Sequence, residues 1–127
     1  EFNQAQHVLA KRYDELLKIL PVTTPFQLAT SHSGWHLYVI CLQLDGISKG
    51  HKQVFDELRA NGIGVNLHYI PVHLQPYYQK LGFAKGDFPQ AEQYYREAIS
   101  LPLFHAMTFS QQDEVVNVLT DVLSCQP

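Results

Sequence analysis

Hydrophobic positions in the first third of the chain follow three successive patterns. Between residues 5 and 20, apolar side chains recur at helical spacing, which predicts an amphipathic helix that Pro21 ends. Residues 21–34 are rich in Pro, Thr, Ser and Gly and predict a loop. Residues 35–44 form a nearly continuous apolar run, which favours a central strand buried on both faces.

The middle of the chain predicts a helix, a strand and a short helical turn. Ser48 is the expected cap of a helix over residues 49–60, which an Asn-Gly pair stops. Residues 63–70 follow as a second strand, and Pro71 ends its hydrogen-bonded ladder. Residues 76–82 begin with proline, end with glycine and predict a single helical turn.

The last third predicts a helix, a strand and a final helix. Asp87 is the expected N-cap of the first of these helices, and Ser110 caps the last. Residues 99–104 form a third strand between them. Together the elements favour an α+β fold, with a small antiparallel or mixed three-stranded sheet covered by helices in a two-layer sandwich. The expected core takes apolar residues from each element: Leu37, Val39, Cys41, Val54, Leu58, Val65, Leu101, Leu103, Leu119 and Leu123.

Composition favours one globular domain over residues 1–127. Hydrophobic residues make up 46% and charged residues 17% of the chain, which is a globular balance. Nine basic residues are spread along a chain of net charge −3, so no nucleic-acid partner is expected. Cys41 is expected to be a buried free thiol, and with Cys125 it does not make a disulfide framework. With no signal peptide and no apolar run near the ~20 residues that span a bilayer, we expect a cytoplasmic protein without membrane contact.

Motifs for metal binding and for nucleophilic catalysis are weak. The histidines form two close pairs without the cysteine or carboxylate that would complete a zinc site: His32 with His36, and His68 with His73. The chain has no Gly-x-Ser-x-Gly elbow and no glycine-rich loop that leaves a strand and opens a helix. We therefore assign no catalytic, cofactor-binding or metal-binding residue within the chain.

One segment is unusual in its chemistry. Residues 62–82 read GIGVNLHYIPVHLQPYYQKLG and place imidazole and phenol groups between prolines that restrict the backbone. Such a segment suits the wall of a ligand cleft, where rings stack and polar tips form hydrogen bonds. The alternative is an aromatic loop packed on the domain's own core. The candidate cleft residues are His68, Tyr69, His73, Tyr77 and Tyr78.

Four blocks of the sequence resemble the C-terminal small domain of the DegT/DnrJ/EryC1/StrS aminotransferases. They are SGWHLYVICL (33–42), FDELRANGIGVNLHYIPVHLQPYYQKLGF (55–83), GDFPQAEQYYREAISLPLF (86–104) and MTFSQQDEVVNVL (107–119). The first helix also resembles the long connector between the two domains of these enzymes. His105 departs from the pattern, because the family often has proline there.

The resemblance implies a function and also what this chain lacks. Family members hold pyridoxal phosphate (PLP) on a lysine of an N-terminal large domain, which also supplies the carboxylate at the pyridine nitrogen and the phosphate cup. Those motifs do not occur in this sequence. The chain is therefore expected to be a C-terminal aminotransferase-like fragment without the PLP-binding large domain, and not catalytic alone. PLP is then the cofactor of the full-length parent only.

The finer resemblance is to one branch of the family. HYIPVHLQPYYQKLGF and FPQAEQYYREAISLPLF are similar to the branch that aminates a UDP-linked 4-keto-6-deoxy hexosamine on the route to pseudaminic acid. The implied partners are the missing large domain, a nucleotide sugar and a second copy of the chain. The alternative function is a stand-alone module that binds a small ligand or a protein without PLP chemistry.

Overall fold

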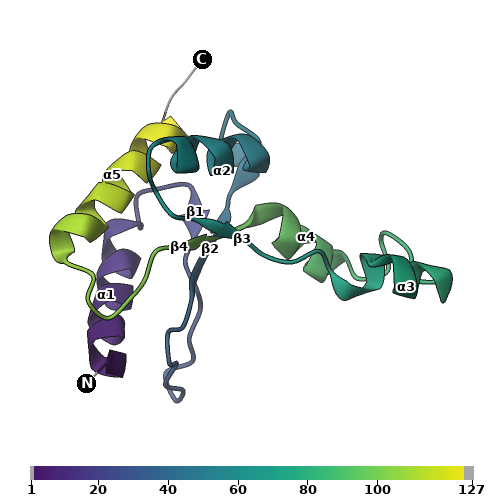
Figure 1. Ribbon diagram of the computed structural model, residues 1–127, viewed down its shortest axis with the longest axis horizontal. Coiled ribbons are helices and arrows are strands. Elements are labelled where there is room, and N and C mark those ends of the chain that lie inside the picture. Colours follow the sequence, from purple (N-terminus) through teal and green to yellow (C-terminus); the bar gives the residue numbers. More distant parts are fainter. Residues whose placement is uncertain (1, 125–127) are drawn as a thin grey trace.

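Antiparallel strands form a four-stranded sheet in the computed structural model of this chain, which describes residues 2–124 (Figure 1). In sheet order the strands are β1 (Val22–Thr23), β2 (Tyr38–Leu42), β4 (Ala98–Leu101) and β3 (Asn66–Leu67). The expected α+β fold is confirmed, with one strand more than the three expected. The additional strand is β1, which pairs with β2 from within the segment expected to be a loop. The interpretation of Cys125 lies outside the described residues and stays a prediction.

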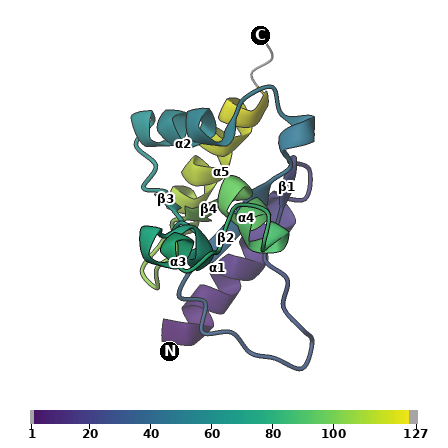
Figure 2. The same ribbon diagram turned by 90° about the vertical axis from the view of Figure 1, so that its right-hand side faces the viewer.

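The helices lie on two sides of this sheet. In chain order the helical elements are α1 (Phe2–Leu16), η1 (Leu44–Gly46), α2 (His51–Ala60), η2 (Val72–Leu74), α3 (Pro76–Lys80), α4 (Pro89–Glu97) and α5 (Phe109–Ser124). Figures 1 and 2 show α1, α2 and α5 gathered on one side, while α3 and α4 project from the other. We call residues 68–97, which contain η2, α3 and α4, the arm.

Only one face of β2 is fully buried. Tyr38, Ile40 and Leu42 are buried, whereas the alternating Val39 and Cys41 are only partly so. The expectation of a strand buried on both faces is therefore wrong. Its physical cause is the unequal cover, because α1 and α5 close the inner face while the outer face opens into a concave surface beside α4.

Two buried phenols join α1 to the rest of the core. Tyr13 donates a hydrogen bond to the Pro102 carbonyl at 2.7 Å, and Tyr38 donates to Asp14 Oδ1 at 2.6 Å. Their rings contact each other with centroids 4.8 Å apart. Burial raises the pKa of both phenols, and for Tyr38 the bond to Asp14 raises the pKa further. Both hydroxyls therefore remain protonated donors at neutral pH, and their hydrogen bonds hold α1 in place.

The expected caps of α2 and α5 are wrong, because these helices begin at other residues than expected. The N-cap of α2 is Gly50, which provides no side-chain cap, and Ser48 lies before it. At α5 the cap comes from Thr108 and Gln111, which lie on either side of the expected Ser110 in the sequence. Thr108 Oγ1 accepts from the Gln111 N–H at 3.1 Å, and Gln111 Oε1 accepts from the Thr108 N–H at 2.9 Å. This reciprocal pair is a capping box.

All three expected strands are shorter in the structure than in the sequence pattern, and the first helix ends at Leu16 instead of continuing to Pro21. The second strand shows the reason. Ile63 is apolar and buried, but its N–H bonds the Leu58 carbonyl at 3.0 Å, so it closes α2 rather than pairing in the sheet. A hydrophobic run therefore predicts which residues are buried, but the paired strand within it is shorter than the run.

The expected core is confirmed for most of its residues and wrong on one face of β2. The buried residues among them are Val54, Leu58, Val65, Leu101, Leu119 and Leu123. Leu103 is partly buried against them. Leu37 is 48% exposed, and Val39 and Cys41 are only partly buried, because they lie on the open face described above.

Leu58 and Leu37 make a matched pair for testing this layout. Leu58 is 0% exposed and Leu37 is 48% exposed. Leu58→Ala should lower the free energy of unfolding by about 2–5 kcal/mol, because it leaves a cavity in the core. Leu37→Ala should change it by about 0.5 kcal/mol or less. Denaturant unfolding of both variants measures the difference, and equal losses would contradict the one-sided core.

Candidate functional site

The arm leaves the sheet as a rigid, proline-bounded segment. Pro71 precedes η2 and Pro76 is the first residue of α3, so fixed φ angles frame both turns. Gly82 and Gly86 then adopt φ of +104° and +95°, in the left-handed region that glycine enters without steric cost. The chain returns through α4, which runs directly into β4. All five candidate cleft residues lie in the outgoing half of the arm.

His68 and Tyr69 lie at the base of the arm and have opposite environments. His68 is partly buried, and its Nε2 lies 3.0 Å from Ser100 Oγ on β4. Its ring also contacts Tyr94 of α4, with centroids 5.5 Å apart. Tyr69 is 93% exposed. The sheet therefore holds His68 in place, while Tyr69 presents its whole ring and hydroxyl to the surroundings.

His73 is buried and paired with a carboxylate. Its Nε2 lies 3.2 Å from Glu92 Oε2, and the two side chains are only 7% and 5% exposed. Glu92 also accepts the Gly86 N–H through both oxygens, at 3.1 and 2.8 Å. One carboxylate thus links η2, α4 and the loop before α4.

Opposing effects act on the Glu92 carboxyl group. Burial raises the pKa of Glu92, whereas hydrogen bonds from the Gly86 N–H and His73 lower it. The hydrogen bonds prevail, and the pKa of Glu92 lies below its ordinary value of 4.5. Glu92 is therefore ionised at neutral pH and acts as an acceptor only.

Asp87 is not the N-cap of α4, so this expectation is also wrong. The N-cap of α4 is Phe88, which makes no side-chain cap. Asp87 Oδ2 instead accepts the Ala84 N–H at 2.8 Å, so it stabilises the turn before the helix. Asp87 and Glu92 thus each hold a backbone N–H of the loop between α3 and α4, at Ala84 and at Gly86.

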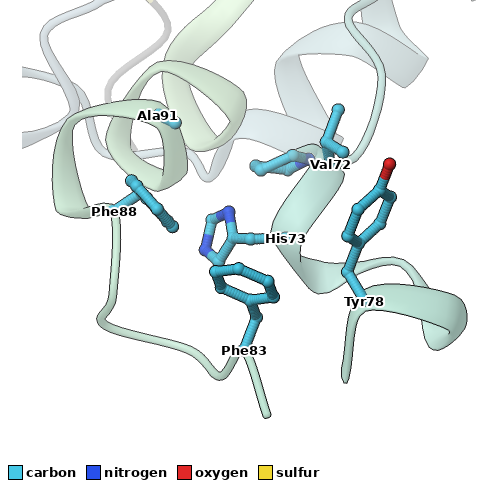
Figure 3. Close-up of a pocket in the computed structure, with 7 residues that line it drawn as sticks. Val72, His73, Tyr78, Phe83, Phe88 and Ala91 are labelled. Atoms are coloured by element: carbon cyan, nitrogen blue, oxygen red, sulfur yellow. The ribbon is translucent and has the colours of Figure 1, made fainter. Parts of the chain in front are cut away.

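Tyr78 and His73 share a cavity, which Figure 3 shows in close-up. The cavity has a volume of about 380 Å³. It is lined by Pro71, Val72, His73, Tyr78, Phe83, Phe88 and Ala91. The His73 ring lies edge-on to Phe88, with centroids 4.8 Å apart. Three of the six residues around this single imidazole are thus aromatic.

The structure brings some of the candidate residues together and separates others. The Tyr77 ring lies edge-on to the Tyr78 ring, with centroids 5.2 Å apart. Tyr77 is 67% exposed. His73 and Tyr78 meet in the cavity, whereas His68 bonds β4 and Tyr69 projects outward. The lining and supporting residues that the sequence analysis missed are Ser100, Phe83, Phe88 and Glu92. The only sequence signal for Glu92 is an acid early in the predicted helix, which favours a dipole interaction on the surface rather than a buried partner for His73.

The histidine pairs considered as metal ligands separate in the fold. His32 stacks on His7 with ring centroids 4.0 Å apart, while His68 and His73 bond Ser100 and Glu92. Within residues 2–124, no three side chains of His, Cys, Asp or Glu are grouped so that they could hold a metal ion. In the same range, no helix is both long and apolar enough to cross a membrane.

Comparison with known proteins identifies the family. The sequence profile of the DegT/DnrJ/EryC1/StrS aminotransferase family matches residues 1–120. The chain belongs to this family. The Bacillus subtilis spore coat polysaccharide biosynthesis protein SpsC is 34% identical over 97% of this chain and 32% of its own length. The chain thus spans about a third of the length of this DegT-family relative.

Solved structures of other proteins show the same fold. The chain superposes on Streptomyces venezuelae DesV, solved in complex with a ketimine intermediate, with a TM-score of 0.87 and 26% identity. That match covers 99% of this chain and 33% of DesV. Helicobacter pylori PseC, an aminotransferase of pseudaminic acid biosynthesis, matches with a TM-score of 0.84, 24% identity, and coverage of 96% and 33%. At that identity the likeness to PseC shows the fold alone.

The lysines of this DegT-family chain do not fit the PLP of an aminotransferase, which needs a lysine facing an enclosed site. Lys49 is the most buried of those in ion pairs, and it bonds Glu57 and the Val122 carbonyl at the end of α5. The side chains of Lys18 and Lys52 are 65% and 87% exposed. The remaining lysines are exposed on the surface: Lys11, Lys80 and Lys85. No reaction step through PLP is therefore assigned to residues of this chain.

Glu92→Gln tests the electrostatic role of the buried pair. Folding lowers the Glu92 pKa, so the ionised carboxylate stabilises the native state fully above pH 4.5, and this gain is lost as the pH falls through the native pKa. The variant should be less stable than the parent at about pH 7, and the gap should narrow towards about pH 3. Denaturant unfolding at both pH values measures it, with the exposed Glu114→Gln as control. A gap that is constant with pH would show that the charge of Glu92 does not contribute.

Proposed function

We propose that this chain is the C-terminal small domain of a PLP-dependent aminotransferase that acts on a nucleotide-linked 4-keto-6-deoxy sugar, and that it is not catalytic alone. The observation that carries the proposal is the family match over nearly the whole chain, combined with an arm that offers imidazole and phenol groups on a rigid support. The remaining two thirds of a protein of the relatives' length would hold PLP, which supplies the electron sink for transamination.

In this proposal the arm binds and orients the sugar nucleotide. Tyr69 is free to offer its hydroxyl to sugar hydroxyls, and the exposed ring of Tyr77 offers an apolar face. His68 is held by Ser100, so its imidazole has a fixed direction at the base of the arm. These residues position substrate rather than move its proton. His73 and Tyr78 shape the cavity behind them.

The finer substrate assignment is to the branch that aminates a UDP-linked 4-keto-6-deoxy hexosamine for pseudaminic acid. It is supported by the sequence of the outgoing arm, HYIPVHLQPYYQKLGF, and of α4 with β4. A cytoplasmic location belongs to the same proposal, and the free, partly buried thiol of Cys41 is compatible with a reducing compartment.

The surface of the arm supports contact with a partner. Exposed apolar residues outside the cavity gather there, and such patches mark interaction sites in soluble proteins: Tyr69, Ile70, Tyr77 and Leu81. We propose that the PLP-binding large domain and a second copy of the chain cover this surface in the complete enzyme.

A second candidate function rests on the cavity of the arm. Its lining residues all lie within residues 71–91, so one contiguous segment of the chain forms it. This favours the alternative of a module that binds a small ligand by itself, without PLP.

Tyr69→Phe in the complete protein tests the aminotransferase proposal. The variant keeps the ring and removes the exposed hydroxyl, so kcat/KM for the sugar nucleotide should fall by about 5-fold or more, as expected for the loss of one hydrogen bond to substrate. The absorbance of bound PLP should not change. Tyr95→Phe, on a partly buried tyrosine of α4, is the matched control. An unchanged kcat/KM for Tyr69→Phe would contradict the proposal that the arm contacts the substrate.

A further inference from the structure

The cavity in the arm combines an aromatic wall with one oriented imidazole. Its volume of about 380 Å³ exceeds the ~150 Å³ of an apolar cavity that admits benzene. Among its lining residues only His73 and Tyr78 carry polar side-chain atoms. The cavity is therefore large enough for one substituted ring, and it offers that ring few polar contacts.

Glu92 determines which nitrogen of His73 carries the proton. An ionised carboxylate only accepts hydrogen bonds, so Nε2 of His73 must donate to it across their 3.2 Å contact. In the neutral ring, Nδ1 then has a free lone pair. Within residues 2–124 no hydrogen bond to Nδ1 is recorded, so this acceptor is available to a ligand.

Neighbouring residues hold the His73–Glu92 pair in place. The Gly86 N–H bonds both oxygens of Glu92, and the left-handed φ of Gly86 directs that N–H towards them. Phe88 packs against the His73 ring, while Phe83 lies beside Phe88 with centroids 6.2 Å apart. Both the direction of the imidazole and the shape of the wall are thus set before a ligand arrives.

We propose that this cavity binds a flat aromatic or heteroaromatic ring that carries an N–H or O–H donor on its edge. The faces of the ring pack on Phe83, Phe88 and Tyr78, and the donor bonds Nδ1 of His73. Phenols and nucleobases share this chemistry. The site includes two residues of the proposed substrate cleft, but it depends on neither PLP nor transamination, so its test uses this chain alone.

Two pairs of ring ligands test the proposal by NMR titration of the isotope-labelled 127-residue chain. Phenol is compared with anisole, and uracil with 1,3-dimethyluracil, because methylation removes the donor and keeps the ring. A donor-bearing ring should shift the signals of Phe83 and Phe88 saturably and bind about 2- to 10-fold more tightly than its methylated partner. A preference within the phenol pair indicates a phenolic ligand, and one within the uracil pair indicates a nucleobase.

Variants separate the hydrogen bond from the wall. His73→Phe should abolish the preference for the donor while the rings still bind, and His36→Phe, on an exposed histidine outside the cavity, should leave the preference unchanged. Ala91→Leu fills the cavity from the surface of α4 and should weaken the binding of both ligands of each pair. This variant keeps the test valid if His73→Phe does not fold.

The histidine nitrogens give an independent result. In the neutral His73 ring of the free chain, their ¹⁵N shifts should show the proton on Nε2 and none on Nδ1. A neutral His73 ring protonated on Nδ1, equal affinities within both ligand pairs, or the absence of saturable shifts at Phe83 and Phe88 would each overturn the proposal.

Discussion

Strand β4 is the element on which the rest of the chain depends. All four of its residues are buried, and it pairs with β2 on one side and β3 on the other. Side chains from two further parts of the chain bond it: His51 of α2 contacts the Ala98 carbonyl at 2.9 Å, and His68 contacts Ser100. Because α4 runs directly into β4, the returning end of the arm joins an inner strand of the sheet, while the outgoing end leaves the edge strand β3.

This anchoring explains why the interior of the arm is held by hydrogen bonds while its surface is exposed and apolar. Its two roots lie close together, because β3 and β4 are paired neighbours and His68 bonds across that pair. Further out, the His73–Glu92 pair ties the outgoing segment to the returning helix. Beyond that pair the arm turns apolar side chains outward. The interior of the arm is therefore fixed by hydrogen bonds, while its surface is available for substrate or another domain.

The sequence predicted those parts of the fold that depend on local periodicity. Helical spacing identified α2 and α5 and most of the core, because the residue pattern of a helix is set by its own geometry. The same reasoning failed for β2, where an apolar run cannot show that one face has only partial cover. It also missed β1, since two residues leave no periodic signal. The family resemblance, rather than periodicity, pointed to the aminotransferase fold.

The candidate site could be predicted only in outline. The composition of residues 62–82 indicated an aromatic and imidazole-rich wall, and His73 and Tyr78 do line a cavity. The partner of His73 lies 19 residues further along the chain. Nothing local marks Glu92 as its partner, because the contact depends on how α4 folds back on η2. Burial of a charged pair is decided by tertiary packing, so it becomes visible only in the structure.

The central claim is that this chain shapes a substrate site and leaves PLP to the rest of the protein. The most direct measurement is the absorbance of bound PLP, taken after dialysis for this chain and for the complete protein side by side. We expect the complete protein to retain the chromophore and this chain to be colourless. A retained chromophore in this chain, with borohydride fixing the cofactor to one of its own lysines, would contradict the claim.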